Sequence, residues 1–297
     1  MLYRCYAKIN LTLEILGRRD DGYHDLASLV HTISLADDLR IEPADELLTR
    51  VEGLDLDPET NLVARAAELV ASATGTRRGA QLSLVKRIPA AAGLGGGSSD
   101  AAATLVGLNA LWQTRLGVPE LSQLAARLGS DVPFFVRGGA AVMRGRGDLL
   151  EPVPPLVGQW LVIVVPPHGL LDKTRRLYAA LEPADFSTGE ITRRGAEVLR
   201  RRERLDDTHL VNGFERAARV VFPGLSVAWA ESERVCGRRF CLSGAGPALF
   251  ALASDRADAL RQRGRLARPG LVVHAARTVK HARASVRFAA ERPIRYP

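Results

Sequence analysis

Apolar and polar residues alternate over much of the first half of the chain, the pattern that a half-buried β-strand produces. Two such segments, residues 3–16 and 26–41, are separated by a polar run at residues 18–22, so the spacing predicts a long hairpin. Further strands are expected at residues 81–88, 132–135 and 140–143. The pattern predicts helices at residues 61–73, 98–116 and 119–128. Asn61 suits the N-cap of the first helix, and Gly75 suits its C-terminal stop.

A proline-rich run, formed by Pro152, Pro154 and Pro155, is the best candidate for a linker between two units. Beyond it, strands are predicted at residues 159–165, 239–243, 248–252 and 271–275. Helices are predicted in the same part of the chain at residues 173–181, 192–204, 210–221, 225–235 and 255–263. A strand-rich half followed by a mixed half indicates an α+β protein with two lobes, residues 1–153 and 154–297, and a ligand site in the cleft between them.

The composition is that of a soluble globular protein. Hydrophobic residues make up 46% of the chain and charged residues 25%, which excludes a disordered or fibrous protein. No apolar run approaches the roughly 20 residues of a membrane span, and the N-terminus lacks the apolar core of a signal peptide. The three cysteines do not form a disulfide framework. We therefore expect a cytoplasmic protein with no membrane partner.

The positive charge is concentrated in the second half. The whole chain has 41 basic and 33 acidic residues. Residues 171–297 contain 25 of the basic residues and 14 of the acidic residues. A basic half is typical of proteins that bind nucleic acid or an anionic ligand. The arginines are interspersed with acidic residues, and no aromatic residues accompany them on which bases could stack. A solvated, arginine-rich surface that could also accept a phosphate-bearing ligand is therefore favoured over a nucleic-acid site. A non-catalytic nucleic-acid-binding protein is kept as an alternative.

Lysine is rare among the basic residues. Only Lys8, Lys86, Lys173 and Lys280 occur, and every other basic residue is arginine. Where arginine serves as the general cation, a retained lysine indicates a need for a compact point charge or a proton-labile amine. This observation draws attention to Lys8 and Lys86.

A glycine-rich loop before the predicted helix at residues 98–116 carries the strongest chemical signal. It reads PAAAGLGGGSSDAA from Pro89 to Ala102, with four glycines within five residues. Glycines let the backbone approach a ligand closely, and the free N–H groups of a helix's first turn bind anions. Ser98 and Ser99 add hydroxyl donors, so the loop is expected to bind phosphate, whereas a simple capped helix would need far fewer glycines. The loop is neither a Walker A loop nor a Rossmann fingerprint.

A lysine, an asparagine and an aspartate fit phosphoryl transfer. Lys8 and Asn10 share one face of the first predicted strand and point at one site. Asp131 stands just before the apolar segment at residues 132–135. An aspartate beside a lysine can accept a proton from a hydroxyl while charge is held in place. Taken alone, each of these residues is better explained as an N-cap or as half of a surface ion pair.

Two turns leave alternatives open. The segment at residues 242–247, with Gly244 and Gly246, is either a tight hairpin or a second loop that closes over the same phosphates. Tyr23 and His24 form either a surface turn or a stacking ring and a hydrogen-bonding imidazole that face a base. The remaining histidines match no metal pattern, so no metal site made by protein residues is predicted.

Several of these motifs are similar, in order, to those of one known family. Residues 89–102 resemble the ATP loop of the GHMP kinase superfamily. Its GGGSSDAA form resembles the branch of the 4-diphosphocytidyl-2-C-methyl-D-erythritol kinases, whereas other branches usually carry a GLGSSAA-like loop. Further motifs similar to that branch stand at residues 7–11, 17–24, 129–135, 212–215 and 242–246.

The resemblance implies a two-lobed α+β fold, with an N-terminal lobe like ribosomal protein S5 domain 2 and a ferredoxin-like C-terminal lobe. It implies ATP and Mg²⁺, and transfer of the γ-phosphate to the 2-hydroxyl of 4-diphosphocytidyl-2-C-methyl-D-erythritol in the non-mevalonate (methylerythritol phosphate) pathway to isoprenoids. A monomer or weak homodimer without a nucleic-acid partner is expected. A GHMP kinase for homoserine, mevalonate or a sugar is the alternative, and Tyr23, His24 and the GGGSSD loop argue against it.

The resemblance also implies residue roles. Asp131 is the base, Lys8 orients it and offsets charge, and Asn10 helps to fix the acceptor. His24 reads the cytosine, and Tyr23 stacks on it. On the adenine and ribose side the expected residues are Asn61, Lys86 and Asp100. The loop residues expected to bind the nucleotide are Pro89, Gly93, Leu94, Gly95, Gly96, Gly97, Ser98 and Ser99. On the substrate side they are Thr174, Tyr178, Gly244 and Gly246, although the loop at residues 166–174 is longer than the family's usual Gly-Val-Ser-Thr.

Overall fold

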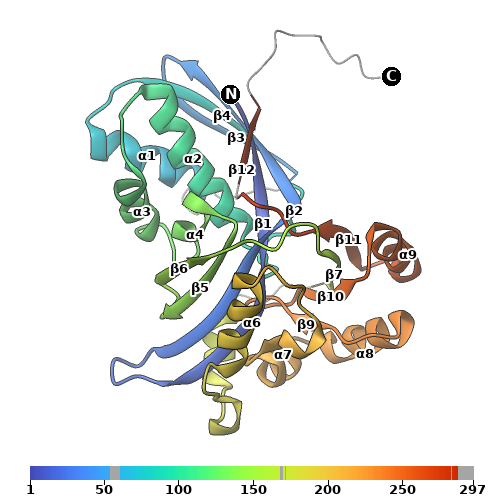
Figure 1. The fold of residues 1–297 in the computed structure, drawn as a ribbon. Helices are drawn as coiled ribbons and strands as arrows, with labels where there is room; N and C mark the ends of the chain where they lie inside the picture. Colours follow the sequence, from blue (N-terminus) through green and yellow to red (C-terminus); the bar gives the residue numbers. More distant parts are fainter. Residues whose placement is uncertain (54–60, 168–169, 171, 282, 287–297) are drawn as a thin grey trace, which may run out of the picture.

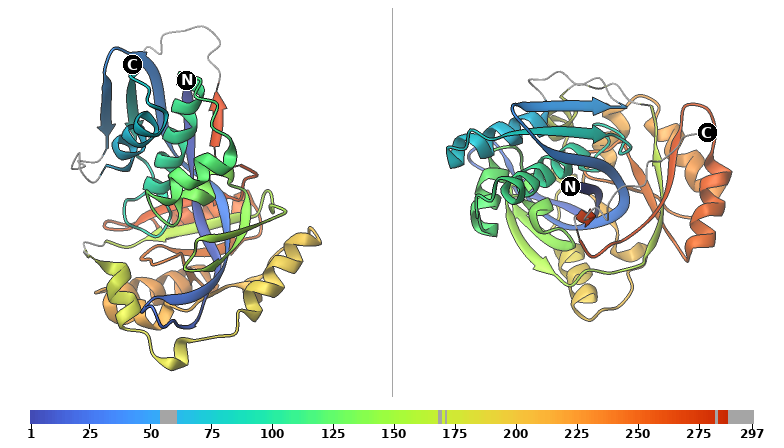
Figure 2. Two further views of the ribbon diagram at one scale, coloured as in Figure 1. Left: turned by 90° about the vertical axis from the view of Figure 1, so that its left-hand side faces the viewer. Right: turned by 90° about the horizontal axis from the view of Figure 1, so that it is seen from above.

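A long antiparallel hairpin forms the spine of the molecule. The computed structural model describes residues 1–53, 61–167, 170, 172–281 and 283–286. In it, strand β1 (Leu2–Arg18) pairs with β2 (His24–Ala44). The hairpin runs through both lobes (Figure 1 and Figure 2). At its tip, the backbone N–H of Tyr23 donates to Asp21 Oδ1 over 3.1 Å. The hairpin predicted from the alternating pattern is confirmed.

The first sheet has eight strands built around this hairpin. Its main order is β12-β1-β2-β4-β3, while β5 pairs with β2, β6 with β5 and β8 with β1. The six further strands are β3 (Leu47–Glu52), β4 (Gly79–Val85), β5 (Ala140–Gly145), β6 (Leu149–Val153), β8 (Val211–Asn212) and β12 (Arg283–Val286). Since β8 and β12 come from the second half of the sequence, both halves contribute to this sheet. The domain boundary between residues 153 and 154 falls directly after β6 and stays a prediction.

Four helices lie on one side of this sheet (Figure 1). They are α1 (Leu62–Thr74), α2 (Gly96–Trp112), α3 (Val118–Ala126) and α4 (Val132–Arg137). Helices α1 and α2 are packed on its strands, and α3 and α4 are packed against α2. Helix α2 is mostly buried, and a Cβ on Gly107 would lie 2.3 Å from Ile41 Cδ1, so glycine permits its close approach to β2. Asn61 caps α1 by accepting a hydrogen bond from the Val63 N–H over 3.0 Å, and Gly75 ends the helix in the left-handed conformation, both as predicted.

The second sheet has four antiparallel strands in the order β11-β7-β10-β9. They are β7 (Trp160–Val165), β9 (Cys241–Leu242), β10 (Leu249–Ala253) and β11 (Val272–Arg277). Strand β7 has neighbours on both edges, and its residues 161–165 are buried, which accounts for their continuous apolar run. The helices of this half are α5 (Lys173–Ala179), α6 (Glu190–Arg200), α7 (Glu215–Val221), α8 (Leu225–Cys236) and α9 (Arg256–Leu266).

One predicted element is wrong, and a second begins later than predicted. Residues 132–135 form the first part of helix α4 instead of a strand. Four apolar residues suit a buried helix as well as a strand. Pro133 in the first turn favours the helix, because its fixed φ fits and its missing N–H is not needed there. The helix predicted at residues 210–221 begins only at Glu215, because β8 pairs with β1 before it.

Four short strands, β3, β6, β8 and β12, were not predicted from the pattern. Strands β3 and β12 lie at the two ends of the main strand order, and β6 pairs with β5 alone. In β3 and β6 nearly every position is exposed or half-buried, so the hydrophobic pattern of these two strands is weak. Among the described residues, no helix has the length and apolar character needed to cross a membrane.

Candidate active site

The first glycine loop joins β4 to α2 and brings backbone atoms close to several partners. Gly93 and Gly95 have φ angles of +85° and +70°, which glycine adopts without strain. A Cβ on Gly93 would lie 2.2 Å from the Ser243 carbonyl oxygen, and one on Gly95 would lie 2.9 Å from Lys8 Cγ. Because the N-cap Gly95 has no side chain, the first N–H groups of α2 stay free to bind an anion.

The second glycine turn, at residues 243–247, docks onto the first loop. Ser243 Oγ donates to the Gly93 carbonyl oxygen over 3.1 Å. The backbone N–H of Ala248 donates to the Ala92 carbonyl oxygen over 3.0 Å. The turn is the hairpin between the antiparallel strands β9 and β10, and it also faces the first loop. Its closure over the phosphates stays a prediction.

Lys8 and Asn10 project from the same face of β1, as predicted, toward both loops. Lys8 Nζ donates to Asn10 Oδ1 over 2.6 Å and lies 3.4 Å from Asp131 Oδ2. Asn10 Nδ2 donates to Ser28 Oγ over 2.7 Å, which holds the amide in one orientation. A Cβ on Gly244 would lie 3.1 Å from both Lys8 Nζ and Asn10 Oδ1, so the second loop covers this pair.

The Lys8–Asp131 pair has one buried and one accessible member. The Lys8 side chain is 5% exposed, and the Asp131 side chain is 34% exposed. Asp131 stands at the N-cap of α4, but its carboxylate makes no cap hydrogen bond there. A hydroxyl group can thus reach the carboxylate while the buried ammonium holds it from the other side.

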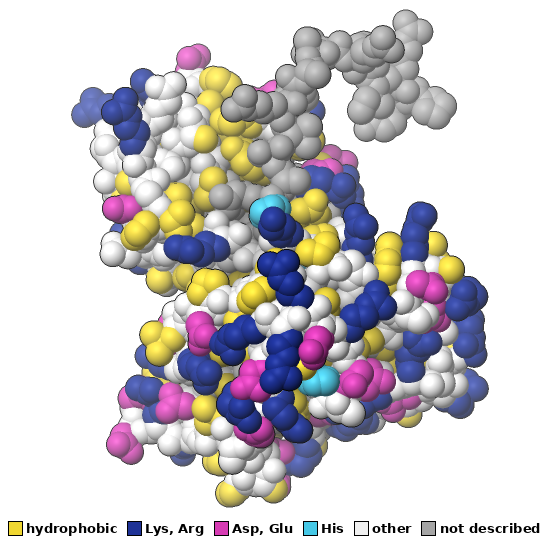
Figure 3. All heavy atoms as spheres, in the orientation of Figure 1, with side chains coloured by type: hydrophobic (Ala, Val, Ile, Leu, Met, Phe, Trp, Pro, Cys, Tyr) yellow, Lys and Arg dark blue, Asp and Glu magenta, His cyan; other side chains and the backbone are white. Residues whose placement is uncertain are grey.

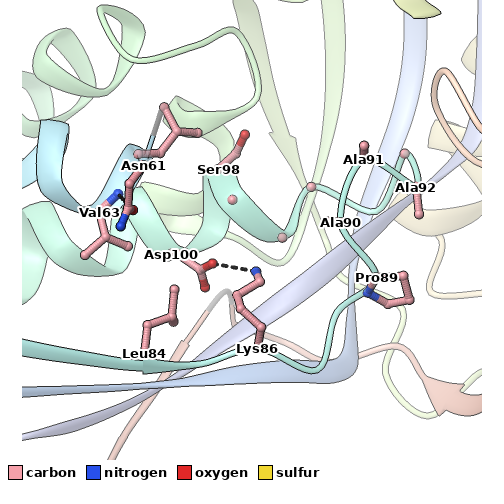
Figure 4. A pocket seen from close by; sticks show the side chains of 15 residues that line it. Asn61, Val63, Leu84, Lys86, Pro89, Ala90, Ala91, Ala92, Ser98 and Asp100 are labelled. Atoms are coloured by element: carbon pink, nitrogen blue, oxygen red, sulfur yellow. Dashed lines mark hydrogen bonds and ion pairs between the residues drawn. The ribbon is translucent and has the colours of Figure 1, made fainter. Parts of the chain in front are cut away.

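A pocket of about 270 Å³ lies beside the first loop (Figure 4). The predicted nucleotide-binding residues in its lining are Asn61, Lys86, Pro89, Gly93, Gly95, Gly96, Gly97, Ser98 and Asp100. Leu94 and Ser99 are instead buried, with exposures of 1% and 2%. The Leu94 carbonyl oxygen accepts the backbone N–H of Lys8 over 2.9 Å and so ties β1 to the loop. Leu62, Val63 and Leu84 add apolar surface to the pocket.

Lys86 lies between two buried carboxylates at the edge of this pocket. Its Nζ is 2.5 Å from Asp37 Oδ2 and 2.7 Å from Asp100 Oδ2. Figure 4 draws the pair of Lys86 with Asp100. Burial lowers the pKa of Lys86, but the Asp100 and Asp37 charges outweigh it and the pKa is raised. Burial raises the pKa of Asp100 to about 7. The sequence did not point to Asp37, which is one polar residue among several in β2.

A second pocket, of about 710 Å³, gathers the residues predicted to bind the base. Tyr23, His24, Thr174 and Tyr178 all line it. The rings of His24 and Tyr178 stack, with centroids 4.9 Å apart and 23° between their planes. Burial, and then the charge of Arg18, lower the pKa of His24, so its imidazole is neutral near pH 7.

Three arginines and a phenylalanine of this pocket were missed. Arg146 Cζ lies 3.9 Å from the centre of the Tyr23 ring. Arg18, Arg175 and Phe186 also line the pocket. No local pattern marks them, since pairing of β5 with β2 brings Arg146 to Tyr23. Residues 168, 169 and 171, in the loop that is longer than the family's, lie outside the described residues.

The basic second half carries many ion pairs on its surface. In helix α6, Arg193 lies 2.6 Å from both Glu190 and Glu197, and Arg200 lies 2.5 Å from Glu151. Figure 3 shows Lys and Arg side chains interspersed with Asp and Glu on the face that it draws. Because acidic side chains neutralise these arginines, the interpretation of this face as a solvated surface is favoured over a continuous binding site for nucleic acid.

Comparison with known sequences identifies close relatives. The family of the GHMP kinases N terminal domain matches residues 61–139. The 4-diphosphocytidyl-2-C-methyl-D-erythritol kinase of Dehalococcoides mccartyi is 40% identical over 251 residues, which cover 84% of this chain and 88% of the relative. The protein of the same name from Pelotomaculum thermopropionicum is 41% identical over 256 residues, with the same coverage.

Solved structures show the same relationship. A crystal structure of 4-(cytidine 5'-diphospho)-2C-methyl-D-erythritol kinase matches with a TM-score of 0.79 and 37% identity, covering 94% of this chain and 99% of the other. The homoserine kinase of Cytophaga hutchinsonii matches with a TM-score of 0.71 at 16% identity, a likeness of fold alone. These neighbours confirm the predicted two-lobed α+β fold of the GHMP kinases. With relatives aligned along more than four-fifths of both sequences, the chain belongs to the 4-diphosphocytidyl-2-C-methyl-D-erythritol kinase family of GHMP kinases.

Proposed function

We propose that the protein transfers the γ-phosphoryl group of ATP to the 2-hydroxyl of 4-diphosphocytidyl-2-C-methyl-D-erythritol, a step of the non-mevalonate route to isoprenoids. The observation that carries this proposal is the position of the Lys8–Asp131 pair between two pockets. Gly95 lines the first pocket and borders Lys8. Ser130 lines the second pocket and directly precedes Asp131. Relatives that align along most of the chain carry the corresponding name.

ATP is assigned to the first pocket. Its base and ribose lie against Asn61, Lys86 and Asp100, beside the apolar wall. Its triphosphate follows the loop at residues 93–99 to the N-terminus of α2, where free N–H groups and the helix dipole favour negative charge. This places the γ-phosphate at the end of the loop that touches Lys8.

Asp131 is assigned as the general base. It accepts the proton of the acceptor hydroxyl while that oxygen attacks the γ-phosphorus. The new O–P bond forms, the bond from the γ-phosphorus to the bridging oxygen breaks, and ADP leaves. Lys8 orients Asp131 and offsets the charge on the phosphoryl oxygens, and Asn10 fixes the acceptor. Phosphoryl transfer depends mainly on such positioning and charge stabilisation.

Mg²⁺ is proposed to enter with the triphosphate. The described residues contain no cluster of three His, Cys, Asp or Glu side chains that would hold a metal alone. This donor set fits Mg²⁺, which binds through substrate phosphates, waters and one or two protein oxygens. Ser98, in the first turn of α2, is the residue that would hold it. When bound, the ion neutralises charge on the phosphate oxygens.

The cytidyl group is assigned to the second pocket. Tyr23 and Tyr178 supply stacking surfaces, and a neutral His24 offers one donor and one acceptor to the cytosine edge. Thr174, with Gly244 and Gly246, is assigned to the phosphates and ribose of the substrate. A homoserine, mevalonate or sugar acceptor would have no use for this aromatic pocket.

The proposal is tested by ADP release from ATP and Mg²⁺ with each candidate acceptor. We expect turnover with 4-diphosphocytidyl-2-C-methyl-D-erythritol, and none above background with homoserine, mevalonate or galactose. Phosphorus NMR of the product should place the new phosphate on the 2-hydroxyl. Turnover with another alcohol would keep the nucleotide site and remove the assignments of Tyr23, His24 and Tyr178. Turnover with none would overturn the proposed function.

We further propose a cytoplasmic enzyme that acts as a monomer or weak homodimer, without nucleic-acid or membrane partners. The ion-paired arginines of α6 support this view. Sedimentation at several concentrations, with and without a short DNA duplex, checks it. A stable complex with the duplex at physiological salt would contradict it.

A further inference from the structure

Lys173 joins the two glycine loops at the start of helix α5. Its Nζ donates to the Ala91 carbonyl oxygen over 2.6 Å and also to the Gly246 carbonyl oxygen. Ala91 belongs to the loop before α2, and Gly246 belongs to the turn between β9 and β10. The ammonium group thus lies where both loops meet, and the function proposed above gives it no role.

The loops do not need Lys173 to hold them together. Ser243 Oγ already donates to the Gly93 carbonyl oxygen, and the Ala248 N–H donates to the Ala92 carbonyl oxygen. The backbone of Gly93 also packs directly on Ser243. A neutral donor would serve equally well as one more link. The positive charge at this place therefore calls for a different explanation.

The charge of Lys173 has no partner of opposite sign within 4.0 Å in the described part of the chain. The other two lysines at the site differ, since Lys8 pairs with Asp131 and Lys86 with two carboxylates. The charged groups that act on Lys173 are Lys8 from β1 and Asp131 before α4. Burial and then repulsion by Lys8 lower the pKa of Lys173 to about 8, while Asp131 acts in the opposite direction. Two nearby ammonium groups and one carboxylate leave a net positive site.

An anion would remove this imbalance. A phosphoryl group lying between both glycine loops would be close to Lys8 on one side and Lys173 on the other. An ammonium has three donors, so it can keep a carbonyl contact and still bind a phosphate oxygen. An arginine at this position would place a larger, planar group between the loops. The smaller ammonium group accounts for a lysine here in a chain whose basic residues are nearly all arginine.

We propose that Lys173 is a second cation, opposite Lys8, that binds the γ-phosphoryl group during transfer. The proposal rests on the proposed function for the identity of the reaction. It assigns Lys173 to a phosphate oxygen of the nucleotide's terminal group, and not to the ADP part. Removing the charge should therefore weaken binding only of nucleotides that carry the γ-phosphate, and should slow transfer.

The first test compares nucleotide affinities by calorimetry, using the full-length protein with Mg²⁺. The variants are Lys173→Met and the matched control Lys280→Met, which removes the same charge from an exposed lysine. For Lys173→Met we expect about tenfold weaker binding of the non-hydrolysable analogue AMPPNP, equivalent to roughly 1.4 kcal/mol. Binding of ADP should change by less than about threefold, as should both affinities of Lys280→Met. Equal losses for both nucleotides, or no loss for either, would overturn the proposal.

The second test uses rates and does not depend on how well the methionine variant folds. In the unaltered protein, kcat/KM for ATP should fall as the pH rises above about 8, because this ratio reports groups of the free enzyme. In Lys173→Arg, which stays charged, this decline should move to higher pH even if the rate is lower. A profile unchanged by Lys173→Arg would overturn the proposal.

If the unaltered protein shows no turnover with the cytidyl substrate, the proposed function fails, while the AMPPNP titration still decides the role of Lys173.

Discussion

The ammonium of Lys8 lies 3.4 Å from the carboxylate of Asp131, and the two residues come from opposite ends of the first half of the chain. Strand β1 places Lys8 in the interior, and the N-cap of α4 presents Asp131 at the surface of the site. The buried cation holds the carboxylate in place, and the accessible carboxylate meets the substrate. This division of roles leads to the first prediction.

Asp131→Asn should lower kcat by about 10²- to 10⁴-fold, the range that general base catalysis contributes. The amide keeps the shape of the side chain but cannot accept the hydroxyl proton. AMPPNP affinity should stay within about threefold, since the nucleotide pocket is unchanged. The matched control is Asp45→Asn, an exposed carboxylate outside both pockets, which should leave kcat as it is. A fully active Asp131→Asn would remove Asp131 from the mechanism.

Gly93→Ala should destabilise the protein and weaken ATP binding. The added Cβ would lie 2.2 Å from the Ser243 carbonyl oxygen at a φ of +85°, so one glycine loop must move away from the other. Left-handed strain alone costs on the order of 1–3 kcal/mol. Gly264→Ala, in helix α9 with open space around the position, should instead raise stability by up to about 1 kcal/mol. Urea unfolding measures both changes, and equal effects of the two would contradict the docking of the loops.

Tyr178→Ala should raise KM for the cytidyl substrate by about tenfold or more, because stacking of a base on an aromatic ring contributes roughly 1–3 kcal/mol. KM for ATP should stay the same, since Tyr178 lines only the second of the two pockets described here. The matched variant Tyr178→Phe keeps the ring and should retain the affinity. If Tyr178→Ala raises KM for ATP and leaves KM for the cytidyl substrate unchanged, the two pockets are assigned the wrong way round.

Asp100→Asn should change how stability depends on pH. The pKa of Asp100 is about 7 in the folded protein because of burial, above its ordinary value of 3.8. The folded state therefore binds a proton more tightly than the unfolded state, and stability falls as the pH rises from about 4 to about 7. Asparagine does not titrate, so the variant should lose this part of the decline. Urea unfolding at pH values across this range measures it, and parallel curves for both proteins would contradict the shift.

The sequence predicted the elements whose signals are local. The hairpin of β1 and β2, the cap of α1 by Asn61 and the buried strand β7 all follow from neighbouring residues. The glycine loop was also recognisable, because close backbone approach and positive φ require glycine whatever lies opposite. The apolar run at residues 132–135 shows the limit of such signals: four apolar residues suit helix and strand alike, and packing against α2 and α3 accompanies the helix.

The family of the chain and the chemical groups it offers can be recognised in the sequence: an aspartate, a rare lysine, two glycine turns and an aromatic–histidine pair. Which of these groups come into contact depends on the folded arrangement. The pairing of Lys86 with Asp37, the contact of Arg146 with Tyr23 and the place of Lys173 between the loops join residues far apart in the chain. Conformational preference depends on adjacent residues, whereas the fields and contacts of charged groups depend on distance in space, and strand register and helix packing set that distance.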